Sequence, residues 1–199
     1  MKKPLIVIAG PTACGKSAVS VELAKIINGE IISADSMQVY RGMDIGTAKI
    51  TKEEMGGIKH YLIDCLNPDE EFSVAVFQTM AKKAIDEILG KGKIPILVGG
   101  TGFYINALIN DNDFSSSKRD YAIREKLKNL LEEKGAEFIY NKLKEYDPEY
   151  ASTVHQNNTK KVIRALEYCL ENNEKFSEYN KREKLKEPIY DLNFFVLNM

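Results

Sequence analysis

The chain has 199 residues, of which 44% are hydrophobic and 29% are charged, and its formal net charge is −1. This composition is typical of a folded globular protein and excludes a disordered chain, whereas the near-zero charge says little about partners. No apolar run approaches the roughly 18 residues of a membrane span. The three cysteines are widely spaced and contain no Cys-x-x-Cys motif, which argues against a disulfide framework or a zinc site. We therefore expect a cytoplasmic protein without a membrane segment.

The first half of the chain alternates strand patterns with helix patterns. Short β-branched runs predict four strands, at residues 5–9, 30–33, 61–64 and 94–98. Apolar residues at helical spacing predict a helix over residues 16–27. Ser73 is a candidate N-cap for a second helix that reaches Leu89, with Gly90 closing it. This alternation predicts an α/β fold, a mainly parallel sheet with helices on both faces, whose ligands bind at the carboxyl ends of the strands.

The second half is helical and more charged, and it begins after a polar, turn-rich stretch at residues 110–117. Helices are predicted at about residues 120–134, 136–146, 159–171 and 177–184. Residues 191–197 return to a strand pattern. We therefore expect three parts: an α/β core at residues 1–113, a helical insertion domain at residues 114–190, and a return strand of the core at residues 191–199.

The segment after the first predicted strand fits the phosphate-loop pattern G-x-x-x-x-G-K-[ST] and opens the first predicted helix. Its glycines let the backbone form a nest of N–H groups for phosphate oxygens, and the helix N-terminus adds positive character. An accidental glycine turn is the alternative, and the motif alone does not say what happens to the phosphates. The expected diphosphate- or nucleotide-binding residues are Gly10, Pro11, Thr12, Ala13, Cys14, Gly15, Lys16 and Ser17.

Further polar residues follow the later strands. Asp35 could accept a proton or hold Mg²⁺, or it could simply cap a turn. Lys49 could face an anion or be an ordinary solvated lysine, and Thr101 stands among three glycines that could bring the backbone close to a ligand or only start a helix. Asp64 resembles a Walker B aspartate and is a second magnesium candidate, although a strand-end cap explains it equally well.

Five motifs, in order and with suitable gaps, resemble those of the tRNA dimethylallyltransferases, also called tRNA isopentenyltransferases. They are residues 10–17, Asp35–Tyr40, Gly46–Lys49, Gly99–Gly102 and Arg164–Glu167. The resemblance runs from the first strand to the end of the chain and implies a P-loop NTPase-like core. It also implies transfer of a dimethylallyl group from dimethylallyl diphosphate to N6 of an adenosine beside the tRNA anticodon, with release of pyrophosphate.

The resemblance assigns roles to the motif residues. The P-loop would hold the diphosphate of the donor, with Mg²⁺ bound through Ser17. Lys16, Asp35 and Thr101 would be the catalytic residues, Asp35 as the base for the amine proton and Thr101 near the bridging oxygen or the reacting base of the tRNA. Together with Asp35 and Thr101, three residues would contact the tRNA around the adenine: Ser36, Met37 and Gln38.

A basic segment in the predicted insertion domain is a candidate for tRNA contact. Lys160, Lys161 and Arg164 would occupy neighbouring rows of one helix face and could bind RNA phosphates, although a solvated helix face is the alternative. By resemblance, Val162 and Ile163 belong to the same contact segment.

Two further positions bear on the tRNA interaction. Arg124 resembles another tRNA-contact position, with an intrahelical pair to Asp120 as the ordinary reading. The family usually has Asp and Arg where this chain has Asn158 and Lys160 or Lys161, and lysine lacks the bidentate fork of arginine.

Members of the family continue well beyond the strand at residues 194–197, so we expect a C-terminally truncated chain that lacks the rest of the core. We also expect a monomer. Two other functions stay open. One is a P-loop kinase of nucleosides or nucleotides with a lid-like helical insert, and the other is a non-catalytic RNA-binding fragment.

Overall fold

The computed structural model describes residues 2–112 and 121–198 and divides into two units. Unit 1 consists of residues 1–112 with 187–199, and unit 2 consists of residues 113–186. The expected insertion ran from residue 114 to 190. Its last four residues fall in unit 1, because the final strand already begins at Tyr190, which pairs with Lys3.

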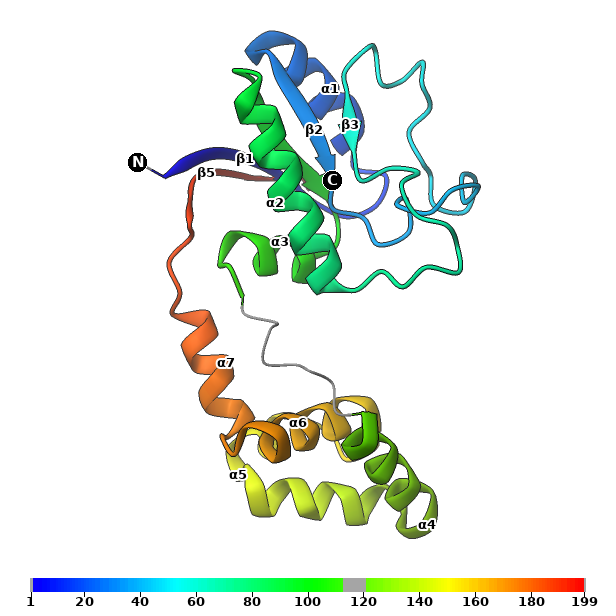
Figure 1. Cartoon of the computed structure of the whole chain (residues 1–199), viewed down its shortest axis with the longest axis vertical. Coiled ribbons are helices and arrows are strands. Elements are labelled where there is room, and N and C mark those ends of the chain that lie inside the picture. Colours follow the sequence, from blue (N-terminus) through cyan, green and yellow to red (C-terminus); the bar gives the residue numbers. More distant parts are fainter. Residues whose placement is uncertain (1, 113–120, 199) are drawn as a thin grey trace. The chain divides into compact units, whose positions relative to one another are not determined.

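Unit 1 is built on a five-stranded sheet in the order β3-β2-β4-β1-β5, and every neighbouring pair is parallel (Figure 1). The strands are β1 (Lys3–Ala9), β2 (Gly29–Ser33), β3 (His60–Tyr61), β4 (Ile94–Gly99) and β5 (Tyr190–Val196). The predicted third strand at residues 61–64 is wrong in its extent. Leu62 and Asp64 have φ values of 61° and 52°, which no β-strand accommodates.

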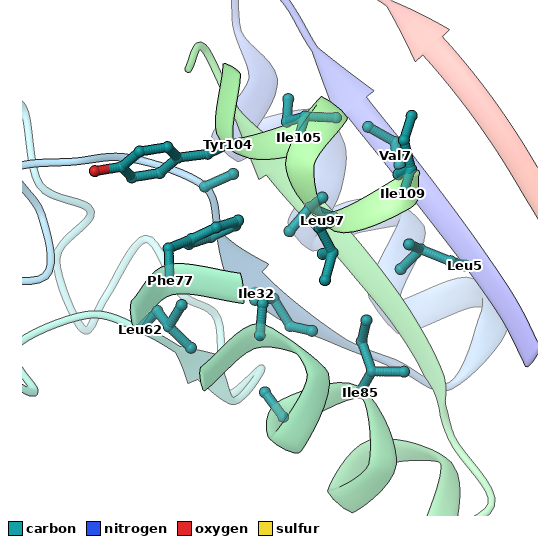
Figure 2. Close-up of a cluster of buried hydrophobic side chains, with 14 of the residues drawn as sticks. Leu5, Val7, Ile32, Leu62, Phe77, Ile85, Leu97, Tyr104, Ile105 and Ile109 are labelled. Atoms are coloured by element: carbon teal, nitrogen blue, oxygen red, sulfur yellow. The ribbon is translucent and has the colours of Figure 1, made fainter. Parts of the chain in front are cut away.

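Helices cover both faces of this sheet. They are α1 (Lys16–Ile27), α2 (Val74–Gly90) and α3 (Gly102–Ile109). Because side chains alternate along a strand, Leu5 and Val7 of β1 join a cluster with α2 and α3, whereas Ile8 joins α1 on the other face. Figure 2 shows the first cluster, in which Phe77 of α2 lies beside Tyr104 of α3 with ring centroids 4.8 Å apart. The predicted α/β fold with a parallel sheet and helices on both faces is confirmed.

Local sequence signals explain where the helices of unit 1 begin and end. Helix α1 has the predicted bounds. Ser73 caps α2 as predicted, since its hydroxyl accepts a hydrogen bond from Val76 N at 3.4 Å. Gly90 is the last residue of α2 instead of its cap, and Lys91 follows it as the C-cap.

Unit 2 is helical in its described part. Its helices are α4 (Tyr121–Tyr146), α5 (Pro148–Thr153), α6 (Thr159–Asn172) and α7 (Phe176–Lys184). Gly135 has a φ of 80° and a ψ of 172°, which breaks α4 where two separate helices were predicted. The apolar core of this unit joins α4 to α6 through Leu143 and Leu166, both fully buried.

A buried carboxylate ties two helices of unit 2 together. Asp147 is 0% exposed and caps α5, its Oδ1 accepting from Tyr150 N at 2.9 Å. Its Oδ2 accepts from Ser177 N at 2.7 Å in the first turn of α7. Helix α5 was not predicted, although Asp147 followed by Pro148 is a typical helix start.

Candidate active site

A cleft of about 1080 Å³ lies in unit 1 where the β-strands end. Four segments contribute much of its lining, as expected for the carboxyl edge of a parallel sheet. They are the P-loop, the turn after β2 at residues 35–38, the loop at residues 42–48, and the end of β4 at residues 98–100. The P-loop and Asp35, which are far apart in sequence, therefore face the same space.

The P-loop backbone requires its glycines. A Cβ atom on Gly10 would lie 2.5 Å from Leu197 O and 2.8 Å from Cys14 Sγ, so no larger residue fits. Gly15, directly before α1, has a φ of 83°, and Ala13 has a φ of 65°. Left-handed residues in such a turn direct successive N–H groups to one side, which is the geometry of an anion-binding nest.

Lys16 and Ser17 begin α1 and line the cleft, as do Thr12, Ala13 and Gly15. The lysine ammonium donates to Pro11 O at 2.5 Å, so it lies against the loop's own backbone. The remaining P-loop residues, Gly10, Pro11 and Cys14, shape the loop without lining the cleft.

Ser17 and Asp35 are the cleft residues that the sequence offered as ligands of Mg²⁺, and both line it. Within residues 2–112 and 121–198, no group of three or more His, Cys, Asp or Glu side chains is placed to bind one. Mg²⁺ that is bound to a diphosphate keeps several waters and needs only one or two protein ligands. A single hydroxyl from Ser17 is therefore compatible with Mg²⁺ bound mainly by diphosphate oxygens.

Asp35 is half-buried in the cleft wall and also caps a turn. Its Oδ1 accepts from Met37 N at 2.8 Å and from Gln38 N at 3.2 Å. A carboxylate has two oxygens with about four lone-pair sites, so capping leaves capacity to accept a proton. The two readings of Asp35 that the sequence left open are compatible with each other.

Thr101 lies next to the cleft, and its catalytic role stays a prediction. It is the N-cap residue of α3 and does not line the cleft, although Gly99 and Gly100 do. A Cβ atom on Gly99 would lie 2.4 Å from Ala34 O, so this glycine is needed for close packing of β4 against the end of β2. The neighbouring backbone is sufficient to account for the glycine at that position.

Lys49 faces two carboxylates of the chain itself, and one of them belongs to Asp64. Lys49 is neither solvated nor directed at the cleft, because its side chain is 4% exposed and pairs with Asp44 and Asp64. Asp64 does not line the cleft, and its carboxylate receives the Lys49 ammonium at 2.5 Å. The Walker B interpretation of Asp64 is therefore wrong.

The basic segment of α6 has one exposed and one buried face. Lys160, Lys161 and Arg164 are exposed, and Asn158 caps the helix beneath them. Val162 and Ile163 are only 1% and 6% exposed and belong to the core of unit 2, so the exposed basic side chains, and not these two, face solvent from this segment. Helical spacing explains the difference, because Val162 and Ile163 lie on another side of α6 than Lys160, Lys161 and Arg164 although the five residues are close in sequence.

Arg124 lies on α4 and is half-buried. The pair with Asp120 that the sequence suggested involves a residue outside the described part of the chain. Position 124 therefore remains a tRNA-contact prediction.

Sequence reasoning missed His60 as a residue of the cleft wall. Its Nδ1 lies 2.9 Å from Ile58 O, and burial lowers the pKa of its imidazole. No local signal identified it, because the pairing of β3 with β2, in which His60 lies opposite Ile31, brings it to the cleft.

Comparisons with known proteins converge on one family. Residues 38–199 match the family model described as IPP transferase. A tRNA dimethylallyltransferase of Lachnoclostridium phytofermentans is 53% identical over 196 residues, which are 98% of this chain and 63% of that relative. No helix in the described residues is long and apolar enough to cross a membrane.

Solved structures agree with the sequence comparisons. A tRNA isopentenylpyrophosphate transferase from Staphylococcus epidermidis is 47% identical with a TM-score of 0.60, covering 98% of this chain and 63% of that one. A eukaryotic dimethylallyltransferase acting on tRNA is 39% identical with a TM-score of 0.85, covering 98% of this chain and 48% of that one. The chain spans about 63% of the length of the curated relatives it matches. It belongs to the IPP transferase family.

Proposed function

We propose that the protein transfers a dimethylallyl group from dimethylallyl diphosphate to the exocyclic N6 amine of an adenosine beside the tRNA anticodon, releasing pyrophosphate. The observation that carries this proposal is that a P-loop and the carboxylate of Asp35 line one cleft. The relatives, which are named tRNA dimethylallyltransferases, supply the reaction.

The P-loop end of the cleft suits the leaving group of this reaction. The backbone nest, the N-terminus of α1 and the Lys16 ammonium all favour an anion there. They would stabilise the negative charge that develops on the diphosphate as the allylic C–O bond breaks. Ser17 would hold Mg²⁺, which, when bound, neutralises part of the diphosphate charge.

The Asp35 side of the cleft suits the acceptor. The N6 amine is a poor nucleophile, because its lone pair is delocalised into the purine. As N6 forms its bond to the allylic carbon, the electrons of the C–O bond leave with pyrophosphate, and Asp35 accepts the amine proton. Ser36 and Met37 line the same wall and would contact the base.

The tRNA would be positioned mainly by its phosphates. Lys160, Lys161 and Arg164 present three exposed cations from one helix, which is the chemistry of backbone contacts. The adenosine must also leave its stack to reach the donor, at a cost of about a few kcal/mol.

The test is an assay of this chain with anticodon stem-loop RNA, labelled dimethylallyl diphosphate and Mg²⁺. We expect labelled N6-modified adenosine by nucleoside mass spectrometry. ATP-dependent phosphorylation of a nucleoside or nucleotide would instead identify a kinase, and RNA binding without turnover would identify a non-catalytic fragment.

Asp35→Asn isolates the proton transfer, since asparagine can still accept the turn-capping hydrogen bonds. We expect kcat to fall about 10²- to 10⁴-fold, the range of general base catalysis, with RNA affinity nearly intact. Asp69→Asn, at an exposed acidic position outside the cleft, is the matched control. Normal turnover by the Asp35 variant would remove Asp35 from the mechanism.

A further inference from the structure

The loop at residues 42–48 lines one side of the cleft with little apolar anchorage. Ile45, in its middle, is 98% exposed. Hydrogen bonds inside the loop include Thr47 Oγ1 donating to Met43 O at 2.6 Å and Ala48 N donating to Ile45 O at 3.2 Å. The position of this cleft wall therefore depends on polar contacts with its surroundings.

Lys49 supplies the strongest of these contacts. Its ammonium donates to Tyr40 O at 2.7 Å, to Asp44 Oδ1 at 2.8 Å and to Asp64 Oδ1 at 2.5 Å. An ammonium has three N–H groups, so three acceptors satisfy it. Since Tyr40 precedes the loop, Asp44 lies within it and Asp64 follows β3, one side chain joins three segments of the chain.

Gln38 connects this group to the catalytic turn. Its Nε2 donates to Thr47 O at 3.2 Å and to Ala48 O at 3.3 Å, at the end of the loop. Its backbone N–H donates to Asp35 Oδ1, and its backbone C=O accepts from Asp64 N at 3.2 Å. Gln38 is thus used in holding the loop to Asp35, and its amide is engaged by protein groups rather than available to read the purine.

Backbone strain gathers around the same side chains. Ala48, Leu62 and Asp64 have positive φ values of 46°, 61° and 52°, a conformation that costs free energy for residues other than glycine. Such residues persist where surrounding contacts hold them. Here they lie at the Gln38 and Lys49 contacts, which indicates a segment held in one specific arrangement.

We propose that Lys49 is a positioning residue, whose buried ammonium holds the loop at residues 42–48 and the Asp35–Gln38 turn in one arrangement so that Asp35 meets the acceptor amine. Lys49 does not line the cleft and acts only through these partners. The inference rests on the proposed function for the identity of the reaction, but the network itself can be tested without turnover.

The first test is backbone hydrogen exchange of the chain carrying Lys49→Met, which removes the ammonium and keeps the length of the side chain. Asp44 and Asp64 side chains are 66% and 50% exposed, so water can solvate them and the fold should survive. We expect faster exchange in the loop at residues 42–48 and also at the Met37 and Gln38 amides. Lys52→Met, at an exposed lysine nearby, should leave both unchanged.

Acceleration confined to the loop, or none at all, would overturn the proposal, because the Asp35 turn would then be independent of Lys49. Asp44→Asn keeps the inference testable should Lys49→Met fail to fold. This variant weakens only the contact between Lys49 and Asp44, whose carboxylate is exposed. We expect a smaller acceleration of exchange in the loop at residues 42–48 and at the Met37 and Gln38 amides.

The second test is turnover. Misplacement of a reacting group by about 1 Å can cost about 100-fold in rate, so Lys49→Met should lower kcat by about that factor with the KM for dimethylallyl diphosphate unchanged. A loss expressed in the donor KM alone would contradict a role at the acceptor side. A wild-type chain that transfers no prenyl group would count against the proposed function only, because the exchange result still decides whether Lys49 holds the turn.

Discussion

Two lysines near the cleft show how surroundings assign different roles to one residue type. Lys16 is half-buried and lies over the P-loop, where an entering diphosphate would meet its charge. Lys49 is buried, which by itself would lower the pKa of its ammonium, but the hydrogen bonds to Asp44 and Asp64 outweigh burial and raise that pKa. Lys49 therefore remains charged and structural, and Lys16 is the lysine available to a ligand.

Lys16→Ala should weaken binding of pyrophosphate or dimethylallyl diphosphate by about 10- to 100-fold, since a hydrogen bond to a charged group contributes about 1.5–3 kcal/mol. Isothermal titration calorimetry measures this directly. Lys25→Ala, at the far end of α1, is the control and should bind as the wild type does. Equal affinities in all three proteins would remove Lys16 from the donor site.

Helix α6 and strand β2 both contribute to a core and also carry charged side chains. Helix α6 packs Val162 and Leu166 into the core of unit 2 and leaves Lys160, Lys161 and Arg164 in solvent. Strand β2 is buried along its length and includes Glu30, whose carboxylate is enclosed by groups from β3 and the end of α2. The exposed cations of α6 predict an effect on RNA binding, and the enclosed carboxylate of Glu30 predicts an effect on the stability of unit 1.

The double variant Lys160→Ala with Lys161→Ala should chiefly weaken RNA binding. Each lost phosphate contact should reduce the slope of log K against log salt by about 0.7 to 0.9. Titration of stem-loop RNA at several salt concentrations, followed by fluorescence anisotropy, measures both quantities. Lys184→Ala, in the last turn of α7, is the exposed control. If the double variant kept the wild-type slope, the segment would be an ordinary solvated face.

Glu30 should make the stability of unit 1 depend on pH. Its carboxylate accepts from Tyr61 Oη at 2.8 Å, Lys91 Nζ at 3.2 Å and Lys93 Nζ at 2.8 Å. Burial acts to raise the pKa of Glu30, but these bonds outweigh it and lower the pKa below its usual 4.5. The stabilisation is therefore complete above about pH 4.5 and is lost as the pH falls through the lower folded value.

Glu30→Gln tests this pH dependence. We expect the free energy of unfolding of the variant, measured in urea at pH 7, to be about 1–3 kcal/mol lower than that of the wild type, because the charged acceptor is lost. The variant and the wild type should converge at lower pH, where Glu30 is protonated in both states. Glu22→Gln, which alters an exposed i,i+3 pair, should match the wild type at every pH. A constant difference across the pH range would show that the charge of Glu30 is not responsible.

On the scale of the whole molecule, the two units have separate cores, and unit 1 presents apolar side chains on β5. This strand lies at the edge of the sheet beside β1. Phe194, Phe195 and Val196 on it are 43%, 54% and 67% exposed. Exposed apolar edge strands are sites where chains associate, so the state of association of this chain is a direct test of that surface.

We expect the chain to self-associate increasingly with concentration, as measured by size-exclusion chromatography with light scattering. Phe195→Lys should reduce the association, because a charged side chain on an edge strand disfavours pairing with another chain. Phe103→Lys is the matched control, since Phe103 is 53% exposed and lies on helix α3 instead of on a strand. A wild-type chain that stays monomeric at all concentrations would contradict this expectation and agree with the monomer that the sequence analysis expected.

Local patterns carried much of the prediction. The bounds of α1, the Ser73 cap, the break at Gly135 and the parallel sheet follow from apolar spacing and from residues adjacent in sequence. The P-loop is a local motif as well, because its strand, turn and helix are contiguous. Asp147 and Pro148 carry a local signal of the same kind, because they form the cap and the first residue of α5.

The sequence by itself determined the family, the α/β class and the identity of the phosphate-binding loop, since these depend on short-range patterns. Only the tertiary structure decided that Lys49 pairs with Asp64, that Gln38 holds a loop, that His60 reaches the cleft and that β4 lies between β2 and β1. The physical reason is that the charge, burial and hydrogen bonds of a side chain depend on groups brought near it by long-range packing. Residue type and spacing state what a side chain can do, and its neighbours in space decide which of those possibilities is realised.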